Sequence, residues 1–120
     1  MKDPIQPNRC ATQLNALAAP ERLRIIRYLR DGPRNVTEIA AMLHAKPVNV
    51  SHHLAVLRHA RMVKSSKRGR FVFYALVPGI LVPSEERPAM ELLDLGCCQL
   101  QLPCDCPAEP KERPSGARRA

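Results

Sequence analysis

The chain has 120 residues, enough for one compact domain, and its apolar fraction of 45% is ordinary for a globular protein. Nineteen Lys and Arg against eleven Asp and Glu leave a formal net charge of +8, which favours nucleic acid or an anionic membrane surface as partner. No apolar run approaches the roughly 20 residues of a spanning helix, and the N-terminus is unlike a signal peptide. We therefore expect no membrane partner and a cytoplasmic protein whose five cysteines are reduced thiols rather than structural disulfides.

The first third of the chain predicts a flexible leader and two helices. Residues 1–8 form the leader. A helix is expected over residues 9–18, with Leu14 and Leu17 on one apolar face. Pro20 suits the first turn of a second helix, because the missing N–H of proline costs nothing there, and a Gly-Pro pair ends that helix.

Two further helices joined by a tight turn form a helix-turn-helix pattern. The first is expected over residues 36–43, with Thr37 as its N-cap. After a break at residues 44–46, the second runs over residues 47–59. Its apolar residues recur at i, i+4 and i+7, which predicts one buried stripe. The residues of that stripe are Val50, Leu54 and Leu57.

The rest of the chain predicts a β-hairpin followed by weaker elements. A basic, glycine-bearing turn leads into the β-branched and aromatic run 71–76, a pattern typical of a wing. A short helix is expected over residues 89–95, a strand over residues 99–102 and a disordered tail over residues 103–120. We therefore predict one winged helix-turn-helix domain over residues 9–102, mainly α-helical with a small β-hairpin wing.

Charge and helical geometry together indicate the DNA-binding residues. No acidic residue lies between Glu38 and Glu85, a stretch rich in Lys and Arg. On helix 47–59, the face opposite the buried stripe carries short polar side chains that suit base edges in the major groove. Basic side chains near its ends and on the wing suit phosphates or the minor groove; the alternative is an ordinary solvated surface. The candidate DNA-binding residues are Lys46, Asn49, Ser51, His52, Arg58, Lys67, Arg68 and Arg70.

The run VTEIAAMLHAKPVNVSHHLAVLRHARMVKSSKRGRFVFYAL resembles the ArsR/SmtB family of winged-helix repressors, as does the preceding ALAAPERLRIIRYLRDG. Together they cover about residues 14–76, and SHHLAVLRHARMV is close to the most diagnostic stretch of the family. The resemblance implies a homodimer that binds a palindromic operator in double-stranded DNA and releases it when a metal, metalloid or oxidant arrives. It also implies that Ser51 and His52 meet bases and that residues 68–70 form the wing tip.

Three features depart from the family pattern. The cysteine pair that many arsenic and cadmium sensors carry on the first helix of the motif is absent from VTEIAAML. The long final helix that usually builds the dimer, often with Asp and His zinc ligands, is not visible after Leu76, so we expect residues 90–102 to contribute to dimerisation. Arg61 stands where the family usually has Gly, so the end of the recognition helix is expected to be strained or differently capped.

The cysteines near the C-terminus are the candidate metal ligands. Thiolates bind soft ions such as As(III), Sb(III), Cd, Cu(I) and Zn. Adjacent side chains of a strand point to opposite faces, so Cys97 and Cys98 need a local turn after Gly96, or a site shared between subunits, to bind one ion. Some arsenic-responsive members of the resembled family use a comparable pair plus one nearby Cys. Cys10 is expected to be a small buried packing residue. The candidate ligands are Cys97, Cys98, Cys104 and Cys106.

Three interpretations stay open for these thiols. They bind a soft ion that releases DNA, they sense oxidants, or they have no sensing role in a DNA-binding or interaction module. An enzyme is not expected, because the chain has no Gly-rich phosphate loop, no candidate triad and no CxxC at a helix start. The neighbouring His52 and His53 cannot chelate one ion, since adjacent helical residues point about 100° apart. His53, nearer the buried side, is expected to pack.

Overall fold

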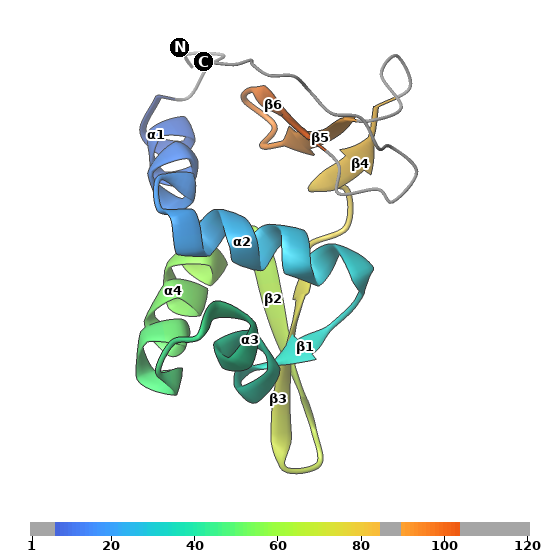
Figure 1. The fold of residues 1–120 in the computed structure, drawn as a ribbon. Helices are drawn as coiled ribbons and strands as arrows, with labels where there is room; N and C mark the ends of the chain where they lie inside the picture. Colours follow the sequence, from blue (N-terminus) through green and yellow to red (C-terminus); the bar gives the residue numbers. More distant parts are fainter. Residues whose placement is uncertain (1–6, 85–89, 104–120) are drawn as a thin grey trace, which may run out of the picture.

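The computed structural model describes residues 7–84 and 90–103, and Figure 1 shows their fold. The helices are α1 (Pro7–Leu17), α2 (Pro20–Tyr28), the 3-10 helix η1 (Leu29–Asp31), α3 (Val36–Leu43) and α4 (Pro47–His59). The strands are β1 (Arg34–Asn35), β2 (Val63–Arg68), β3 (Phe71–Leu76), β4 (Leu81–Pro83), β5 (Met90–Asp94) and β6 (Gln99–Pro103). The predicted winged helix-turn-helix fold is confirmed, and a second sheet is added to it.

The helix boundaries follow from local chemistry. Pro20 and Pro47 lie in the first turns of α2 and α4, where the missing N–H breaks no hydrogen bond. Gly32 follows η1 with a φ of 138°, which favours glycine. Helix α1 begins at Pro7, so it overlaps the predicted leader, whose first six residues lie outside the described part of the chain.

The cap of α3 differs from the prediction. Thr37 was expected to cap this helix, but the side chain of Asn35 accepts a 2.9 Å hydrogen bond from the Glu38 N–H. In return, the Glu38 carboxylate accepts a 3.0 Å hydrogen bond from the Asn35 N–H. The prediction was wrong because α3 begins at Val36, which places Thr37 inside the first turn and makes Asn35 the first residue of a capping box.

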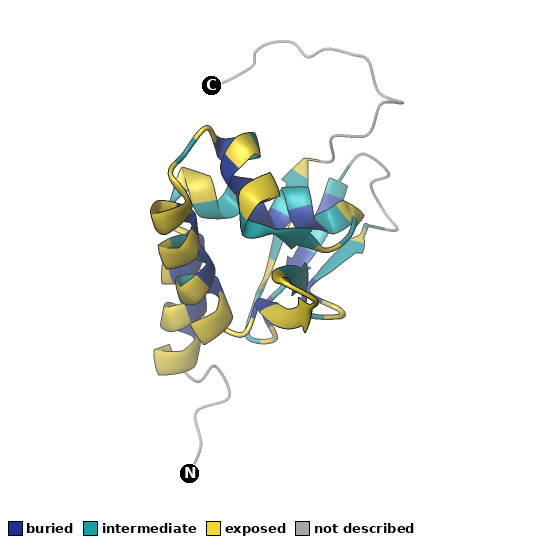
Figure 2. Cartoon of the chain, turned by 90° about the horizontal axis from the view of Figure 1, so that it is seen from below, coloured by how far each residue is buried: buried dark blue, intermediate teal, exposed yellow. Residues whose placement is uncertain are grey.

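One apolar core joins all the helices. The stripe predicted for α4 is buried, as expected from its spacing, and α3 buries Ile39, Ala40 and Leu43. The face predicted for α1 is only partly right: Leu17 is buried, but Leu14 is 41% exposed. Figure 2 shows the buried residues gathered on the inner faces of the helices. The largest fully buried side chains are Ile25, Ile26, Ile39, Val50, Leu54, Leu57, Met62, Val63 and Leu93.

The predicted hairpin is the wing. Strands β2 and β3 pair antiparallel with Arg68 opposite Phe71, so Gly69 and Arg70 form a two-residue turn. Strand β1 pairs with the other edge of β3, which gives the order β1-β3-β2. The hairpin projects away from the helical body (Figure 1). Its tip, where the residues of both strands are exposed, is therefore free to contact another molecule.

The second sheet replaces the predicted short helix at 89–95. Strand β5 pairs antiparallel with β4 and β6, in the order β4-β5-β6. Along β5, Glu91 and Leu93 are buried while Met90, Leu92 and Asp94 are half-buried, a period of two that is typical of a strand. The predicted strand at 99–102 is confirmed as β6. The helix prediction was wrong because β4 and β6 supply hydrogen-bond partners to the backbone N–H and C=O groups of β5. A short segment on its own cannot satisfy all of these groups.

Candidate nucleic-acid interface and cysteine cluster

Helices α3 and α4 are joined by a tight turn. His44 ends α3 in the left-handed region, with a φ of 54°, which His adopts more readily than most residues. The Ala45 N–H then donates a 3.1 Å hydrogen bond to the Ala40 carbonyl. This closes the end of α3, and Pro47 starts α4 only three residues later. The turn therefore fixes α4 as the second helix of the motif.

Helix α4 has one buried face and one exposed face. Val50, Leu54 and Leu57 are fully buried. The predicted DNA-binding residues of this region, Lys46, Asn49, Ser51, His52 and Arg58, are all exposed. Val48 beside them is 70% exposed, which is high for an apolar side chain. The exposed face carries small, polar and basic side chains and no carboxylate.

The end of α4 is closed by a residue that departs from the resembled family. Arg61 has a φ of 64°, in the left-handed region that favours glycine. The Met62 N–H donates a 3.0 Å hydrogen bond back to the Leu57 carbonyl, which completes the cap. A non-glycine residue in this conformation costs about 1–2 kcal/mol. The sequence expectation of strain at Arg61 therefore agrees with the backbone geometry.

The wing presents its basic residues to solvent. Lys67, Arg68 and Arg70 are exposed, and Gly69 between them has a φ of 62°. The Arg68 guanidinium lies 5.5 Å from the centre of the Phe73 ring, a distance suited to a cation–π contact. That contact orients Arg68 along the hairpin without neutralising its charge.

His53 packs as expected and joins three helices. Its Nδ1 lies 3.2 Å from Nη1 of Arg22 in α2. Arg22 also donates a 2.6 Å hydrogen bond from Nε to the Ala16 carbonyl in α1. Burial, followed by the positive charge of Arg22, lowers the pKa of His53 below its ordinary value. The neutral imidazole therefore accepts a hydrogen bond from Arg22 and steadies α4 against α1 and α2.

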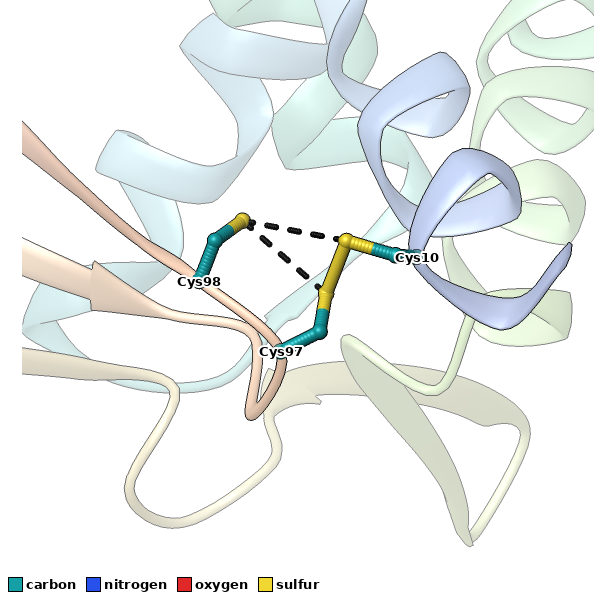
Figure 3. Close-up of side chains that lie close together, drawn as sticks. All are labelled: Cys10, Cys97 and Cys98. Carbon is teal, nitrogen blue, oxygen red and sulfur yellow. Dashed lines mark hydrogen bonds between the residues drawn. A yellow bond between two sulfur atoms is a disulfide. The ribbon is translucent and has the colours of Figure 1, made fainter. Parts of the chain in front are cut away.

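A cluster of three cysteines lies where α1 meets the second sheet (Figure 3). Cys10 of α1 forms a disulfide with Cys97, and their Cα atoms are 5.9 Å apart. The Cys98 Sγ lies 3.9 Å from the Cys97 Sγ and 4.0 Å from the Cys10 Sγ. The turn that precedes β6 brings the two neighbours together: Gly96 has a φ of 90°, and the Leu95 N–H donates a 2.9 Å hydrogen bond to the Cys98 carbonyl. The predicted turn at Gly96 is therefore present.

This cluster corrects two sequence-based expectations. The cysteines were expected to be free thiols, whereas two of them are bonded. Cys10 was expected only to pack, and it is indeed 8% exposed, but it is also the third sulfur of the cluster. The physical reason is tertiary: folding brings together residues that are 87 positions apart. The proposed ligands Cys104 and Cys106 lie outside the described residues.

Gln13, which the sequence analysis did not single out, connects the cluster to α4. Its side chain is 4% exposed, and its Nε2 donates a 3.4 Å hydrogen bond to the carbonyl of Ala60, the C-cap of α4. Its Oε1 lies 3.9 Å from the Cys97 Sγ. The spacing Cys10, Gln13, Leu17 is that of one helix face and could have indicated a buried glutamine.

The second sheet is also held to the body by an ion pair. Arg30 Nη1 of η1 lies 3.2 Å from Oε1 of Glu91 in β5. The Glu91 side chain is only 11% exposed. Burial opposes the charged form of Arg30, but the hydrogen bond and the negative charge of Glu91 outweigh it and raise the pKa of Arg30. Arg30 therefore stays charged, and its contact with Glu91 fixes β5 against η1.

Comparison with known proteins identifies the relatives of this chain. The family described as "Bacterial regulatory protein, arsR family" matches residues 19–65. The transcriptional activator HlyU of Vibrio cholerae is 34% identical over 86 residues, which cover 72% of this chain and 75% of HlyU. The chain belongs to the arsR family.

Further relatives of this arsR-family chain match over its helical half. The transcriptional regulator NmtR of Mycobacterium tuberculosis is 42% identical over 66 residues, which cover 55% of each chain. The match thus spans about half the length of this relative. Among solved structures, reduced HlyU from Vibrio cholerae has a TM-score of 0.57 at 32% identity, covering 61% of this chain and 77% of HlyU. A "possible transcriptional regulator for arsenical resistance" has a TM-score of 0.53 at 39% identity, covering 55% and 69%.

The described part of the chain contains no helix that is both long and apolar enough to cross a membrane. This agrees with the absence of a long apolar run in the sequence.

Proposed function

We propose that this arsR-family protein is a transcriptional repressor that reads duplex DNA with α4 and the wing. One observation carries the proposal. The exposed face of α4 and the wing tip both lack acidic side chains, with small and polar side chains on the helix and basic ones on the hairpin. Such a surface suits base edges in the major groove at the helix and phosphates or the minor groove at the wing.

The residues divide into two roles. Asn49, Ser51 and His52 lie in the N-terminal half of α4, where side chains reach base edges, and Asn can bond adenine bidentately. The basic side chains serve the backbone and fix the register without reading sequence. These residues are Lys46, Arg58, Lys67, Arg68 and Arg70.

A homodimer on a palindromic operator completes the proposal. One recognition helix covers only a half-site, and a two-fold pair spaced one DNA turn apart supplies useful specificity. Leu14 on α1 is 41% exposed, which suits an apolar contact with a second copy. Residues 90–102, which were expected to contribute to dimerisation, lie largely in β5 and β6 of the second sheet, which is the other candidate surface. Sedimentation showing a monomer at micromolar concentration, with and without DNA, would exclude this arrangement.

The test of DNA reading uses genomic fragments, from which the preferred site is selected and then titrated. Specific binding should exceed binding to random DNA, and log affinity should fall with log salt by roughly 0.9 per phosphate contacted. A protein that binds all fragments equally would not be a sequence-specific repressor.

We further propose that the cysteine cluster senses a thiophilic ion. When reduced, Cys10, Cys97 and Cys98 offer three soft donors whose sulfurs lie within 4.8 Å of one another, which suits As(III), Sb(III), Cd, Cu(I) or Zn. Cys10 is thus the third proposed ligand beside Cys97 and Cys98, and Cys104 and Cys106 remain candidate additional ligands. The match to a possible regulator for arsenical resistance makes As(III) the first ion to test.

A redox sensor is the second candidate, and the disulfide favours it. A peroxide would convert the Cys10 and Cys97 thiols and one H₂O₂ into the disulfide and two H₂O. Cys98, 4.0 Å from Cys10 and 3.9 Å from Cys97, can attack either sulfur of that bond in a thiol–disulfide exchange. Ion binding by the three thiolates and formation of the disulfide would each join α1 to the second sheet.

One titration separates these candidates. The operator complex of the reduced protein is challenged with arsenite, antimonite, cadmium, copper(I), zinc and, separately, peroxide. Release by ions that the Cys98→Ser variant resists would indicate a three-thiolate site. Release by peroxide that Cys98→Ser retains and Cys10→Ser loses would indicate redox sensing. No response in any arm would leave a DNA-binding module without a sensing role.

A further inference from the structure

We propose that Gln13 is the positioning residue that transmits the state of the Cys97 thiol to the end of the recognition helix. The inference rests on the proposed sensing function and adds the route by which it acts. Gln13 lies between the two sites: its Nε2 is 3.4 Å from the Ala60 carbonyl, and its Oε1 is 3.9 Å from the Cys97 Sγ.

The orientation of the Gln13 carboxamide follows from its partners. The Ala60 carbonyl can only accept a hydrogen bond, so the NH₂ group of Gln13 must face it. Oε1 then faces Cys97, where only an S–H group can donate to it. The structure holds the disulfide form, in which the Nε2–Ala60 distance of 3.4 Å is long for an N–H···O bond. Reduction would give Oε1 an S–H donor 3.9 Å away, so a reduced Cys97 thiol would fix the carboxamide at both ends and strengthen its hold on Ala60.

Both sensing reactions remove this hydrogen. In the Cys10–Cys97 disulfide the Cys97 sulfur carries no proton, and an ion-bound Cys97 is a thiolate. The sulfur then offers Oε1 no donor, and a thiolate attracts the NH₂ end of the carboxamide instead. Because the side chain is 4% exposed, bulk water has little access to replace the lost contact. Either reaction therefore weakens the hold of Gln13 on Ala60.

Ala60 is where a small change reaches both DNA-contacting elements. It is the C-cap of α4, and β2 of the wing begins at Val63. The intervening turn includes Arg61 in the left-handed region and closes through the bond from the Met62 N–H to the Leu57 carbonyl. The last carbonyls of a helix have no partner within the helix. Gln13 supplies one for Ala60, so it fixes the angle between recognition helix and wing.

The test compares the ratio of operator affinities of the reduced and oxidised proteins, measured at equal salt. Wild type should bind more tightly when reduced, by about tenfold if one buried hydrogen bond is at stake. In Gln13→Met, which keeps length and bulk but cannot donate or accept, this ratio should fall towards one while the disulfide still forms. Gln99→Met makes the same change at an exposed glutamine near the cluster and should keep the wild-type ratio. Gln13→Asn keeps the amide but is too short to reach both partners, so it should also lose the ratio.

A second readout separates transmission from a merely structural role. By linkage, operator DNA must oppose disulfide formation by the same factor as oxidation weakens DNA binding. In a thiol buffer series, DNA should shift the thiol–disulfide midpoint of wild type and of Gln99→Met but not that of Gln13→Met. If both Gln13 variants keep the wild-type ratio and shift, the proposal for Gln13 is wrong. If neither peroxide nor arsenite changes the operator affinity of the wild type, the proposed sensing function itself is wrong.

Discussion

The two sheets in the described part of the chain flank the same helical core and differ in what they contact. The wing hairpin pairs only with itself and with the short β1, and most of its side chains point to solvent. The second sheet faces inward: Leu93 is fully buried, Glu91 pairs with Arg30, and Cys97 is bonded to Cys10. The first sheet is thus available to another molecule, whereas the second is attached to helices distant in sequence. A chemical change at the second sheet is therefore linked to α1 and η1 through the disulfide and the ion pair.

The largest expected effect tests whether the two regions share one core. Leu54→Ala in α4 and Leu93→Ala in β5 each remove a side chain with no exposed surface. Each should lower the free energy of unfolding by about 2–5 kcal/mol. Urea unfolding followed by circular dichroism should show one transition in both variants. A separate early transition in Leu93→Ala would mean that the second sheet unfolds alone.

The next effect concerns the bond between the second sheet and α1. A cross-link between residues 87 positions apart reduces the conformational entropy of the unfolded chain. The free energy of unfolding should therefore be about 2–4 kcal/mol higher for the oxidised protein than for the reduced one. Urea titrations with and without dithiothreitol measure the difference. Cys10→Ser should abolish it and Cys98→Ser should preserve it; equal loss in both variants would contradict the pairing.

On the DNA-facing side, smaller effects should separate base contacts from phosphate contacts. Asn49→Ala should reduce the preference for operator over random DNA by about 1–3 kcal/mol if Asn49 bonds adenine bidentately. Arg68→Ala should weaken specific and random binding together and reduce the salt slope by about 0.9. Arg9→Ala, at an exposed arginine on α1, is the charge-matched control. If Arg68→Ala changes the preference for operator over random DNA and Asn49→Ala does not, the assignment of bases to Asn49 and phosphates to Arg68 is reversed.

The smallest expected effect is a pH dependence at the junction between α4 and the other helices. Burial, followed by the charge of Arg22, lowers the pKa of His53 in the folded protein below the ordinary 6.5. A depressed folded pKa gives full stability above the unfolded pKa and a loss as pH falls through the folded value. Urea midpoints from pH 8 to pH 5 should therefore decline below about pH 6.5, and His53→Gln should flatten the decline. An unchanged decline in that variant would assign it to other groups.

Local signals in the sequence determined the helix-turn-helix and the wing. Apolar spacing placed Val50, Leu54 and Leu57 on the buried face of α4, prolines marked helix starts, and a glycine-bearing basic turn marked the hairpin. These features depend on residues a few positions apart, so spacing alone reveals them. The residue that caps α3 was missed by two positions, because Asn35 and Thr37 are both suitable caps and only the helix start distinguishes them.

Tertiary structure alone decided how the second sheet and the cysteines are arranged. The segment 90–94 is a strand because β4 and β6 lie on either side of it, and the sequence does not state which segments pair. Cys10 meets Cys97, and Gln13 meets Ala60, across separations of 87 and 47 residues. No spacing rule spans such distances, because contacts between remote residues depend on how whole elements pack. The sequence determined the DNA-binding fold, and packing alone determined which thiols lie together and which helix they are linked to.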